Sequence, residues 1–221
     1  MDPYQNNFDT WDKVADLYQE TFMDLDTYND SYDAFCKAIE KPVAHIFEIG
    51  CGPGNITRYY LSKRPDDVLE AIDSSANMIR LAQANNPTAA FRVMDCRQID
   101  QIESRYDGII CGFVLPYLSN DDRVKLIHDC AGLLTDGGVL YLSALKGDSA
   151  RSGYEFGSNG KDRMYIYYHP ETELVANLES NQFEVLETFQ KVFSKPDGSH
   201  MTHLIILARK SQVGPASQNL P

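Results

Sequence analysis

The chain has 221 residues, 43% of them hydrophobic and 24% charged, with a formal net charge of −12 at pH 7. A chain of this length and composition is expected to fold as one larger domain, or as one domain with an insertion, around a sizeable core. Its excess of acid disfavours DNA or bulk RNA as a partner, because polyphosphate backbones repel negative charge.

Two amphipathic helices are predicted at the start of the chain, over residues 9–20 and 28–39, because apolar side chains recur there at helical spacing. The recurring residues are Trp11, Val14, Ala15 and Tyr18 in the first helix, and Tyr32, Phe35, Cys36 and Ile39 in the second. Pro42 interrupts the pattern, since proline breaks a helix. We expect residues 1–40 to form a helical cap on a main domain over residues 41–211.

From residue 43 onward, predicted strands and helices alternate. The strands cover residues 43–49, 68–72, 89–94, 106–111 and 139–144, and the helices cover residues 56–63, 75–85 and 121–134. Ser74 or Ser75 is expected to cap the second of these helices, and Asn120 or Asp121 the third. Strand–helix alternation at this spacing predicts a parallel sheet covered by helices on both faces.

The end of the chain has a different pattern. A helix is predicted over residues 171–180, followed by two strand-like runs, 183–194 and 200–208, with the turn residues Pro196-Asp197-Gly198 between them. Together these elements predict a doubly wound, Rossmann-like α/β fold with a seven-stranded, mostly parallel sheet and an antiparallel C-terminal hairpin. Residues 212–221 are polar and are expected to form a frayed tail.

The first predicted strand runs into a glycine-rich turn, Gly50-Cys51-Gly52-Pro53-Gly54, with Glu48 two places before it. Glycines let the backbone turn tightly and let a ligand approach without a Cβ in the way. The following helix N-terminus is electropositive and can face a carboxylate or phosphate. Dinucleotide-binding sites also have such a turn, but with Gly-x-Gly-x-x-Gly spacing, whereas the spacing here is Gly-x-Gly-x-Gly.

At these residues the sequence resembles the class I S-adenosylmethionine-dependent methyltransferases, and the small-molecule type in particular. The turn from Glu48 to Gly54 resembles their first motif. Four further segments resemble their later motifs in the same order: Ala71–Met78, Met94–Cys96, Tyr106–Phe113 and Leu133–Tyr141. The resemblance covers roughly residues 43–145, and five motifs in the right order are far more specific than any one of them.

The resemblance implies S-adenosylmethionine as the cofactor, with S-adenosylhomocysteine as its product, and a small molecule as the methyl acceptor. It implies that Asp73 binds the ribose hydroxyls and that Asp95 meets the adenine amino group. Both acids end neighbouring strands, at the sheet edge where such folds bind ligands. The cofactor residues expected from it are Glu48, Gly50, Cys51, Gly52, Asn55, Asp73, Ser74, Met78, Asp95, Cys96, Phe113 and Tyr18.

The methyl acceptor is expected to lie beside the segment 113–118 that follows the fourth strand. Residues 145–170 are longer than a plain connection requires and rich in Gly and Tyr, so we expect them to be a substrate-covering insertion. The expected substrate residues are Tyr117, Tyr154, Tyr168 and His169. No catalytic residue is assigned; His169, whose ordinary pKa suits a general base, and Tyr117 are the candidates, and both also have purely structural interpretations.

Neither a metal nor a membrane is an expected partner. Asn120-Asp121-Asp122 is interpreted as a helix start, because other metal ligands are missing, and no run of about 18 apolar residues occurs. The chain begins Met-Asp-Pro-Tyr, without a secretory signal pattern, and its cysteines are odd in number and widely spaced: Cys36, Cys51, Cys96, Cys111 and Cys130. We expect a cytoplasmic monomer or homodimer with reduced thiols.

Two other functions share part of this pattern. An NAD(P)-binding oxidoreductase also has the strand, the glycine turn and the acid that ends the second strand, although the glycine spacing, Asp95 and the terminal hairpin disfavour it. A non-catalytic protein that keeps the fold to bind the cofactor is the other alternative.

Overall fold

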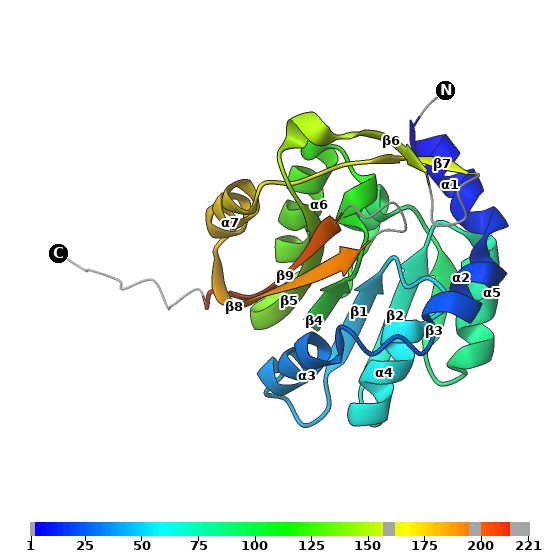
Figure 1. Ribbon diagram of the computed structural model, residues 1–221. Coiled ribbons are helices and arrows are strands. Elements are labelled where there is room, and N and C mark those ends of the chain that lie inside the picture. The colour runs from blue at the N-terminus through cyan, green and yellow to red at the C-terminus, as the bar shows by residue number, and fades with distance from the viewer. Residues whose placement is uncertain (1–2, 157–161, 195–199, 213–221) are drawn as a thin grey trace.

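The computed structural model describes residues 3–156, 162–194 and 200–212. Its main sheet has seven strands in the order β3-β2-β1-β4-β5-β9-β8 (Figure 1). β1 to β5 are parallel, while β9 is antiparallel to both β5 and β8. The bounds are β1 His45–Ile49, β2 Val68–Asp73, β3 Ala90–Val93, β4 Tyr106–Cys111, β5 Leu134–Lys146, β8 Phe183–Ser194 and β9 His200–Lys210. The predicted fold is confirmed.

Two apolar cores lie on opposite faces of this sheet. On one face the sheet packs against α6 (Asn120–Leu133) and α7 (Glu171–Ser180), and on the other against α3 (Asn29–Ala38), α4 (Asn55–Lys63) and α5 (Ala76–Asn85). Successive strand residues point to opposite faces. Ile109 therefore belongs to the first core and Ile110 to the second. Strands buried on both faces explain the nearly continuous apolar runs in the sequence.

The helix starts at the sheet edge are set by serine caps. Ser75 Oγ accepts the N–H of Met78 at 3.0 Å and caps α5, as one of the two predicted alternatives stated. The predicted cap of α6 was wrong. Ser119, not Asn120 or Asp121, is the N-cap, and its Oγ accepts the N–H of Asp122 at 3.2 Å. The acids occupy the first turn of α6 instead, where the helix dipole also favours them.

The N-terminal segment begins earlier than predicted and is broken. Instead of one helix over residues 9–20, there are two, α1 (Pro3–Lys13) and α2 (Ala15–Phe22), which meet at Val14. Val14 has φ −98° and ψ 12°, outside the helical region, so the chain changes direction there. In Figure 1 both helices lie along α5.

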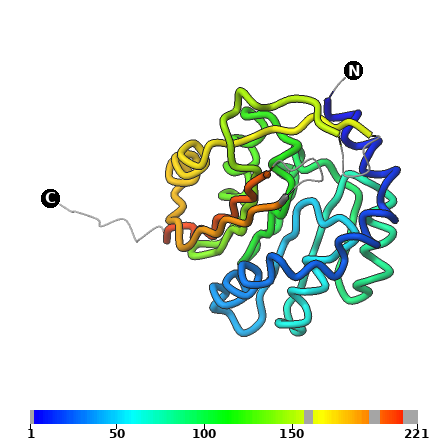
Figure 2. The backbone as a smooth tube through the Cα atoms, viewed as in Figure 1, coloured from blue at the N-terminus to red at the C-terminus, as the bar shows by residue number. Residues whose placement is uncertain are grey.

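The expected insertion, residues 145–170, has regular structure that the sequence analysis did not predict. It contains a short 3₁₀ helix, η3 (Ser149–Arg151), and a separate two-stranded antiparallel sheet of β6 (Gly153–Phe156) and β7 (Arg163–Ile166). The backbone trace shows this hairpin beside α1 (Figure 2). The predicted turn 196–198 lies outside the described residues, as does all of the expected tail except Gln212.

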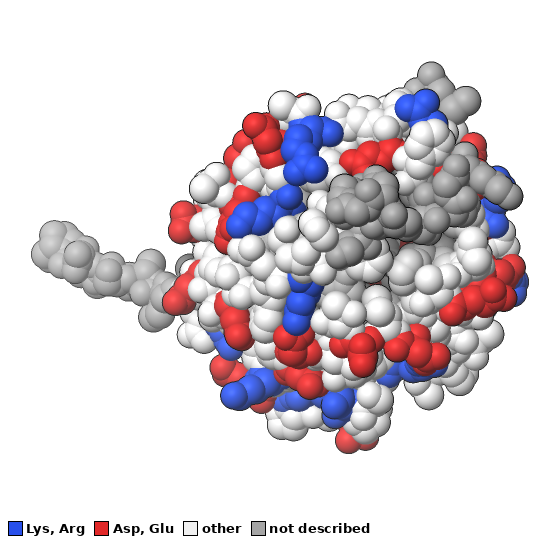
Figure 3. All heavy atoms as spheres, viewed as in Figure 1, with Lys and Arg blue, Asp and Glu red and all other residues white. Residues whose placement is uncertain are grey.

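Further features of the structure are the distribution of its surface charge, the length and apolarity of its helices, and the state of its cysteines. On the face drawn in Figure 3, Lys and Arg side chains are interspersed with Asp and Glu rather than gathered in one patch. Among the described residues, no helix has the length and apolarity needed to cross a bilayer. The five cysteines are free thiols.

Candidate functional site

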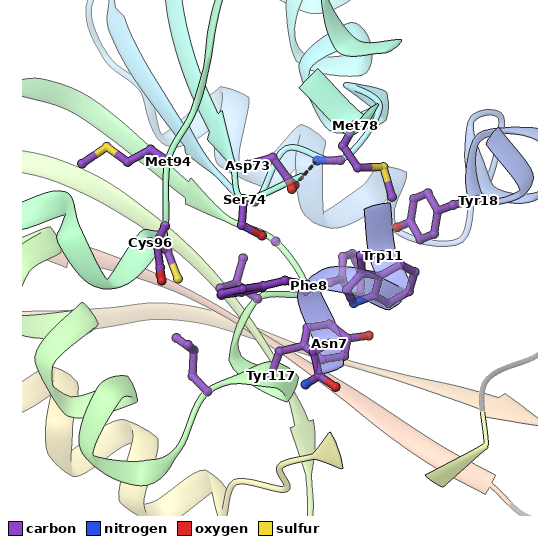
Figure 4. A pocket seen from close by; sticks show the side chains of 17 residues that line it. Asn7, Phe8, Trp11, Tyr18, Asp73, Ser74, Met78, Met94, Cys96 and Tyr117 are labelled. Atoms are coloured by element: carbon purple, nitrogen blue, oxygen red, sulfur yellow. Dashed lines mark hydrogen bonds between the residues drawn. The ribbon is translucent and has the colours of Figure 1, made fainter. Parts of the chain in front are cut away.

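A pocket opens at the carboxyl ends of β1, β2 and β4, the edge at which doubly wound sheets bind ligands (Figure 4). Three segments that are distant in sequence line it: the N-terminal helices, the loops after β1, β2 and β3, and the segment after β4, which includes η2 (Leu115–Tyr117). The lining residues are Asn7, Phe8, Trp11, Tyr18, Gly50, Gly52, Asp73, Ser74, Met78, Met94, Asp95, Cys96, Gly112, Phe113, Val114, Tyr117 and Leu118.

The glycine turn after β1 has a backbone that side chains would disrupt. Gly50 and Gly52 have φ values of +69° and +54°, in the left-handed region that favours glycine. A Cβ on Gly50 would lie 2.3 Å from Cγ2 of Val114. A Cβ on Gly52 would project into open space, with the Tyr18 ring as its nearest neighbour at 3.8 Å. The turn therefore leaves a cradle over Gly52 that a ligand can fill.

Asp73, at the end of β2, is joined to this turn. Its two carboxylate oxygens accept the backbone N–H of Gly52 and that of Ser75, each at 2.9 Å. Burial raises the pKa of Asp73 above its ordinary value, although the N–H groups of Ser75, Gly52 and Ser74 oppose the shift. A carboxylate can accept about four hydrogen bonds, so Asp73 retains acceptor capacity at the pocket.

Asp95, after β3, is held by the side chain of Arg97. Nε of Arg97 lies 3.1 and 2.9 Å from the two carboxylate oxygens, and the backbone N–H of Arg97 also donates to Asp95 at 2.9 Å. Burial acts to raise the pKa of Asp95, but the hydrogen bonds from Arg97 outweigh it and the pKa is lowered. Asp95 is therefore ionised at neutral pH, and Cys96 beside it lines the same part of the pocket.

Glu48 lies beneath the glycine turn and is fully buried, at 1% exposure. One of its oxygens accepts the hydroxyl of Thr57, while the other has no hydrogen-bond partner in the described part of the chain. Burial raises the pKa of Glu48 to about 8, and the negative charge of Asp73 adds to the shift. Glu48 is not among the pocket-lining residues, so the structure places it behind the turn.

Three aromatic rings from two parts of the chain meet at one side of the pocket. Trp11 of α1 stands edge-to-face with Tyr18 of α2, with ring centroids 5.4 Å apart and planes at 89°. It makes a similar contact with Tyr117, at 5.4 Å and 77°. Burial raises the pKa of both tyrosines well above the ordinary value, so both phenols remain neutral. We call Trp11, Tyr18 and Tyr117 the aromatic trio.

Helix α1 is fixed over the pocket by polar contacts at three places. The hydroxyl of Tyr4 donates to Asp122 at the start of α6, and the amide of Asn7 is bonded to the backbone of Tyr165 in β7. Asp12 accepts Ser75 Oγ at 2.7 Å at the start of α5. The same helix supplies Asn7, Phe8 and Trp11 to the pocket wall.

The pocket brings together nine of the twelve expected cofactor residues: Tyr18, Gly50, Gly52, Asp73, Ser74, Met78, Asp95, Cys96 and Phe113. Besides Glu48, the exceptions are Cys51, which is buried in the core, and Asn55, which begins α4. Of the expected substrate residues, Tyr117 alone lines the pocket.

The other expected substrate residues lie away from the pocket wall. Tyr154 is 42% exposed on β6, and Tyr168 is buried with its hydroxyl donating to Glu155. His169 is fully buried, with Nε2 2.8 Å from the Leu115 carbonyl and Nδ1 3.3 Å from Nη1 of Arg123. Burial lowers the pKa of His169, and both ring nitrogens have partners. This placement does not suit a general base; His169 instead links β5, η2 and α6.

The pocket also contains lining residues that were not expected there: Asn7, Phe8, Trp11, Met94, Gly112, Val114 and Leu118. Val114 and Leu118 lie in the segment 113–118 that was expected to face the acceptor. Asn7 and Phe8 lie before the predicted helix start at residue 9, although Phe8, Trp11 and Ala15 continue one helical spacing that could have extended it. No group of His, Cys, Asp and Glu within the described ranges is arranged to hold a metal ion.

Residues 46–138, which include the glycine turn and both pocket acids, match the family model described as a methyltransferase domain. The matched segment spans β1 to the start of β5 and excludes α1 and the β6–β7 hairpin.

Known proteins resemble the chain in sequence and in fold. A trans-aconitate 2-methyltransferase of Methylobacterium radiotolerans is 36% identical over 42% of this chain and 35% of its own length. An N-demethylindolmycin N-methyltransferase of Streptomyces griseus is 29% identical over 59% of this chain and 56% of its own length. The crystal structure of magnesium protoporphyrin IX methyltransferase from Synechocystis PCC 6803 with bound SAH superposes with a TM-score of 0.72. That structure is 17% identical and covers 95% of this chain and all of the other.

The sequence matches are partial. The matched region covers about a third of the length of the first curated relatives, 36% and 35%. The structural match shows the fold over nearly the whole chain.

Proposed function

We propose that this protein is an S-adenosylmethionine-dependent methyltransferase that acts on a small molecule. The observation that carries the proposal is the convergence of the glycine cradle, Asp73 and Asp95 on one pocket at neighbouring strand ends. A nucleoside with an amino-acid tail presents hydroxyls, an exocyclic amine and a charged end along one line. The site presents acceptors and an open backbone along a similar line.

Each part of the pocket has a role in this proposal. Asp73 accepts the ribose hydroxyls with the lone pairs that Gly52 and Ser75 leave free. Asp95 accepts the adenine amino group and the Cys96 backbone N–H meets the ring, while Met78 packs on the adenine. The open space above Gly52 takes the amino-acid tail, with Tyr18 over it. Glu48, Cys51 and Asn55 act indirectly, by shaping the turn and the start of α4.

When bound, the cofactor would supply an electrophilic methyl group attached to a sulfonium. A lone pair of the acceptor forms the new bond to the methyl carbon, and the electrons of the broken C–S bond remain on sulfur. The chain contributes approach geometry and exclusion of water. The aromatic trio and Phe113 wall the place where the methyl group would lie, and α1 covers it. Among the described lining residues there is no His or Lys. The proposal therefore assigns no His or Lys as a general base, and a proton on the acceptor atom passes to water once the methylated product leaves the pocket.

The proposal also assigns roles to the segments of the chain, a class of partner, a compartment and an oligomeric state. Residues 1–40 act as a helical cap, residues 41–211 as the main domain, and residues 145–170 as the insertion that covers the acceptor by bracing α1 through Asn7. The relatives named above act on small molecules, and the net charge of −12 disfavours nucleic acid. Five free thiols fit a reducing cytoplasm, and we propose a monomer or homodimer there.

Calorimetric titration with S-adenosylhomocysteine tests the cofactor assignment, with NAD⁺ and NADP⁺ as matched controls. We expect S-adenosylhomocysteine to bind and neither dinucleotide to compete with it. Tight NAD(P) binding without S-adenosylhomocysteine binding would overturn the proposal in favour of an oxidoreductase. Transfer of a labelled methyl group to a panel of small molecules then separates an enzyme from a protein that only binds the cofactor.

A further inference from the structure

The part of the pocket wall that the proposed function leaves for the acceptor is almost entirely apolar. After the cofactor residues are set aside, its side chains are those of Phe8, Trp11, Met94, Val114, Tyr117 and Leu118, together with Asn7. In Figure 4, Phe8, Trp11 and Tyr117 lie together across the pocket from Met94 and Cys96. No Lys, Arg or His lines the pocket within residues 3–156, 162–194 and 200–212.

The one amide in this wall is already engaged. Asn7 is 1% exposed, and its Nδ2 and Oδ1 are both bonded to the backbone of Tyr165, at 3.0 Å each. Two polar groups in this wall can form hydrogen bonds with a ligand: the hydroxyl of Tyr117 and the indole N–H of Trp11. Both residues bind mainly through their ring surfaces, which suit an apolar partner.

Two arginines that follow lining segments, Arg97 and Arg123, have partners of their own. Arg97 is paired with Asp95, and its guanidinium lies 4.1 Å from the ring centroid of Tyr4. Arg123, behind η2, is 5% exposed and is bonded to His169 and Glu173. Neither side chain lines the pocket.

This distribution of charge selects against anionic acceptors. A carboxylate placed against the apolar wall would lose its hydration without gaining a cationic partner, and buried unpaired charges are costly. The carboxylates of Asp73 and Asp95 would repel it as well. A cationic amine is disfavoured for a different reason, because a protonated nitrogen has no lone pair with which to attack a methyl group.

We propose, as an extension that rests on the proposed function, that the methyl acceptor is an uncharged molecule with an apolar, ring-bearing body held by Phe8, Trp11 and Tyr117. The pocket excludes polycarboxylates. Specificity thus resides largely in α1 and η2, outside the strands that hold the cofactor.

The test uses pairs of probes that share a ring and differ in one charge: indole-3-acetamide with indole-3-acetate, benzamide with benzoate, and nicotinamide with nicotinate. Each is titrated into the full chain already saturated with S-adenosylhomocysteine. We expect the amide of each pair that binds to do so about ten-fold or more tightly than its acid. Equal or tighter binding of the acids, or no binding by any amide, overturns the inference.

Two substitutions at one position link this preference to the wall. Tyr117→Ala should weaken amide binding several-fold, whereas Tyr117→Phe should retain it, because Phe keeps the ring surface. Tyr59→Ala, in α4 and outside the pocket wall, is the matched control and should change neither ligand's affinity. Equal amide affinity in Tyr117→Ala and the unmodified chain overturns the inference.

The two proposals fail separately. If S-adenosylhomocysteine itself does not bind, the proposed function fails. If it binds and the acids are preferred, the proposed function stands and the acceptor class is wrong.

Discussion

Asn7 on α1 and Tyr165 on β7 hold each other through two hydrogen bonds, although 158 residues separate them. Nδ2 of Asn7 donates to the Tyr165 carbonyl, and the Tyr165 N–H donates to Oδ1 of Asn7, both at 3.0 Å. The Asn7 amide thus pairs with both backbone groups of Tyr165, as a neighbouring strand would. Because Asn7 also lines the pocket, this pair connects the β6–β7 hairpin to the proposed acceptor site.

Replacing this side chain should destabilise the protein. Asn7→Ala leaves the partly buried N–H and carbonyl of Tyr165 without these partners, at a cost of about 1–3 kcal/mol in the free energy of unfolding. Urea denaturation measures the loss. Gln5→Ala, whose exposed side chain lies on the same helix, is the control and should cost far less. Equal stability of the two variants would show that the Asn7–Tyr165 pair contributes little.

Asp73→Asn should weaken binding of S-adenosylhomocysteine. The substitution removes the charge that the ribose hydroxyls would bond and one of the acceptor oxygens, which we expect to cost about 1–3 kcal/mol of binding free energy. Isothermal calorimetry gives the affinity, and a thermal melt checks that the fold persists. Asp16→Asn, at an exposed surface pair with Arg80, serves as the control. An unchanged affinity for Asp73→Asn would mean that Asp73 only supports the glycine turn.

Gly50→Ala should damage both the fold and the site. The new Cβ would lie 2.3 Å from Val114 Cγ2, and the residue would be held at φ +69°, a conformation that costs about 1–3 kcal/mol for a residue other than glycine. Gly132→Ala is the matched control. Gly132 lies in α6 with no atom within 4 Å of an added Cβ, so alanine there should stabilise the helix by up to about 1 kcal/mol. Comparable melting temperatures for the two variants would contradict the prediction that a Cβ at position 50 destabilises the fold.

Glu48 predicts a specific dependence of stability on pH. Its folded-state pKa of about 8 lies above the ordinary 4.5, so the folded protein binds a proton that the unfolded chain has released. This contribution to stability is fully present below pH 4.5 and is lost as the pH rises through about 8. Glu48→Gln has no such proton to lose. The difference in melting temperature between variant and unmodified protein should therefore grow in favour of the variant from about pH 5 to about pH 9; a constant difference would refute the assignment.

The order of strands and helices was predictable because it depends on local sequence patterns, namely the spacing of apolar residues and the residues that begin and end each element. The predicted alternation of strands and helices matches the observed one, and both pocket acids lie where strand ends place them. The β6–β7 hairpin was not predictable in this way. Its strands have four residues each, and they are supported by α1, a contact that joins distant parts of the chain.

The differences at His169, at the start of α6 and in α1 have a similar cause. His169 has the chemistry of a base, but its role depends on Arg123 and the Leu115 carbonyl, which only the folded chain brings to it. Ser119 competed with two neighbouring cap-forming residues, and the choice among them was set by the backbone angles before α6. Asn7 and Phe8 of α1 were missed because the helix begins earlier than predicted.

Trp11 is the sole tryptophan in the sequence, and it lines the pocket between Tyr18 and Tyr117. Indole emission depends on the polarity around the ring, so the intrinsic fluorescence of this protein originates from one location. A molecule that enters displaces water beside that ring and alters the colour or intensity of the emitted light. The unlabelled protein thus carries its own optical reporter of occupancy, with no second indole to obscure the signal.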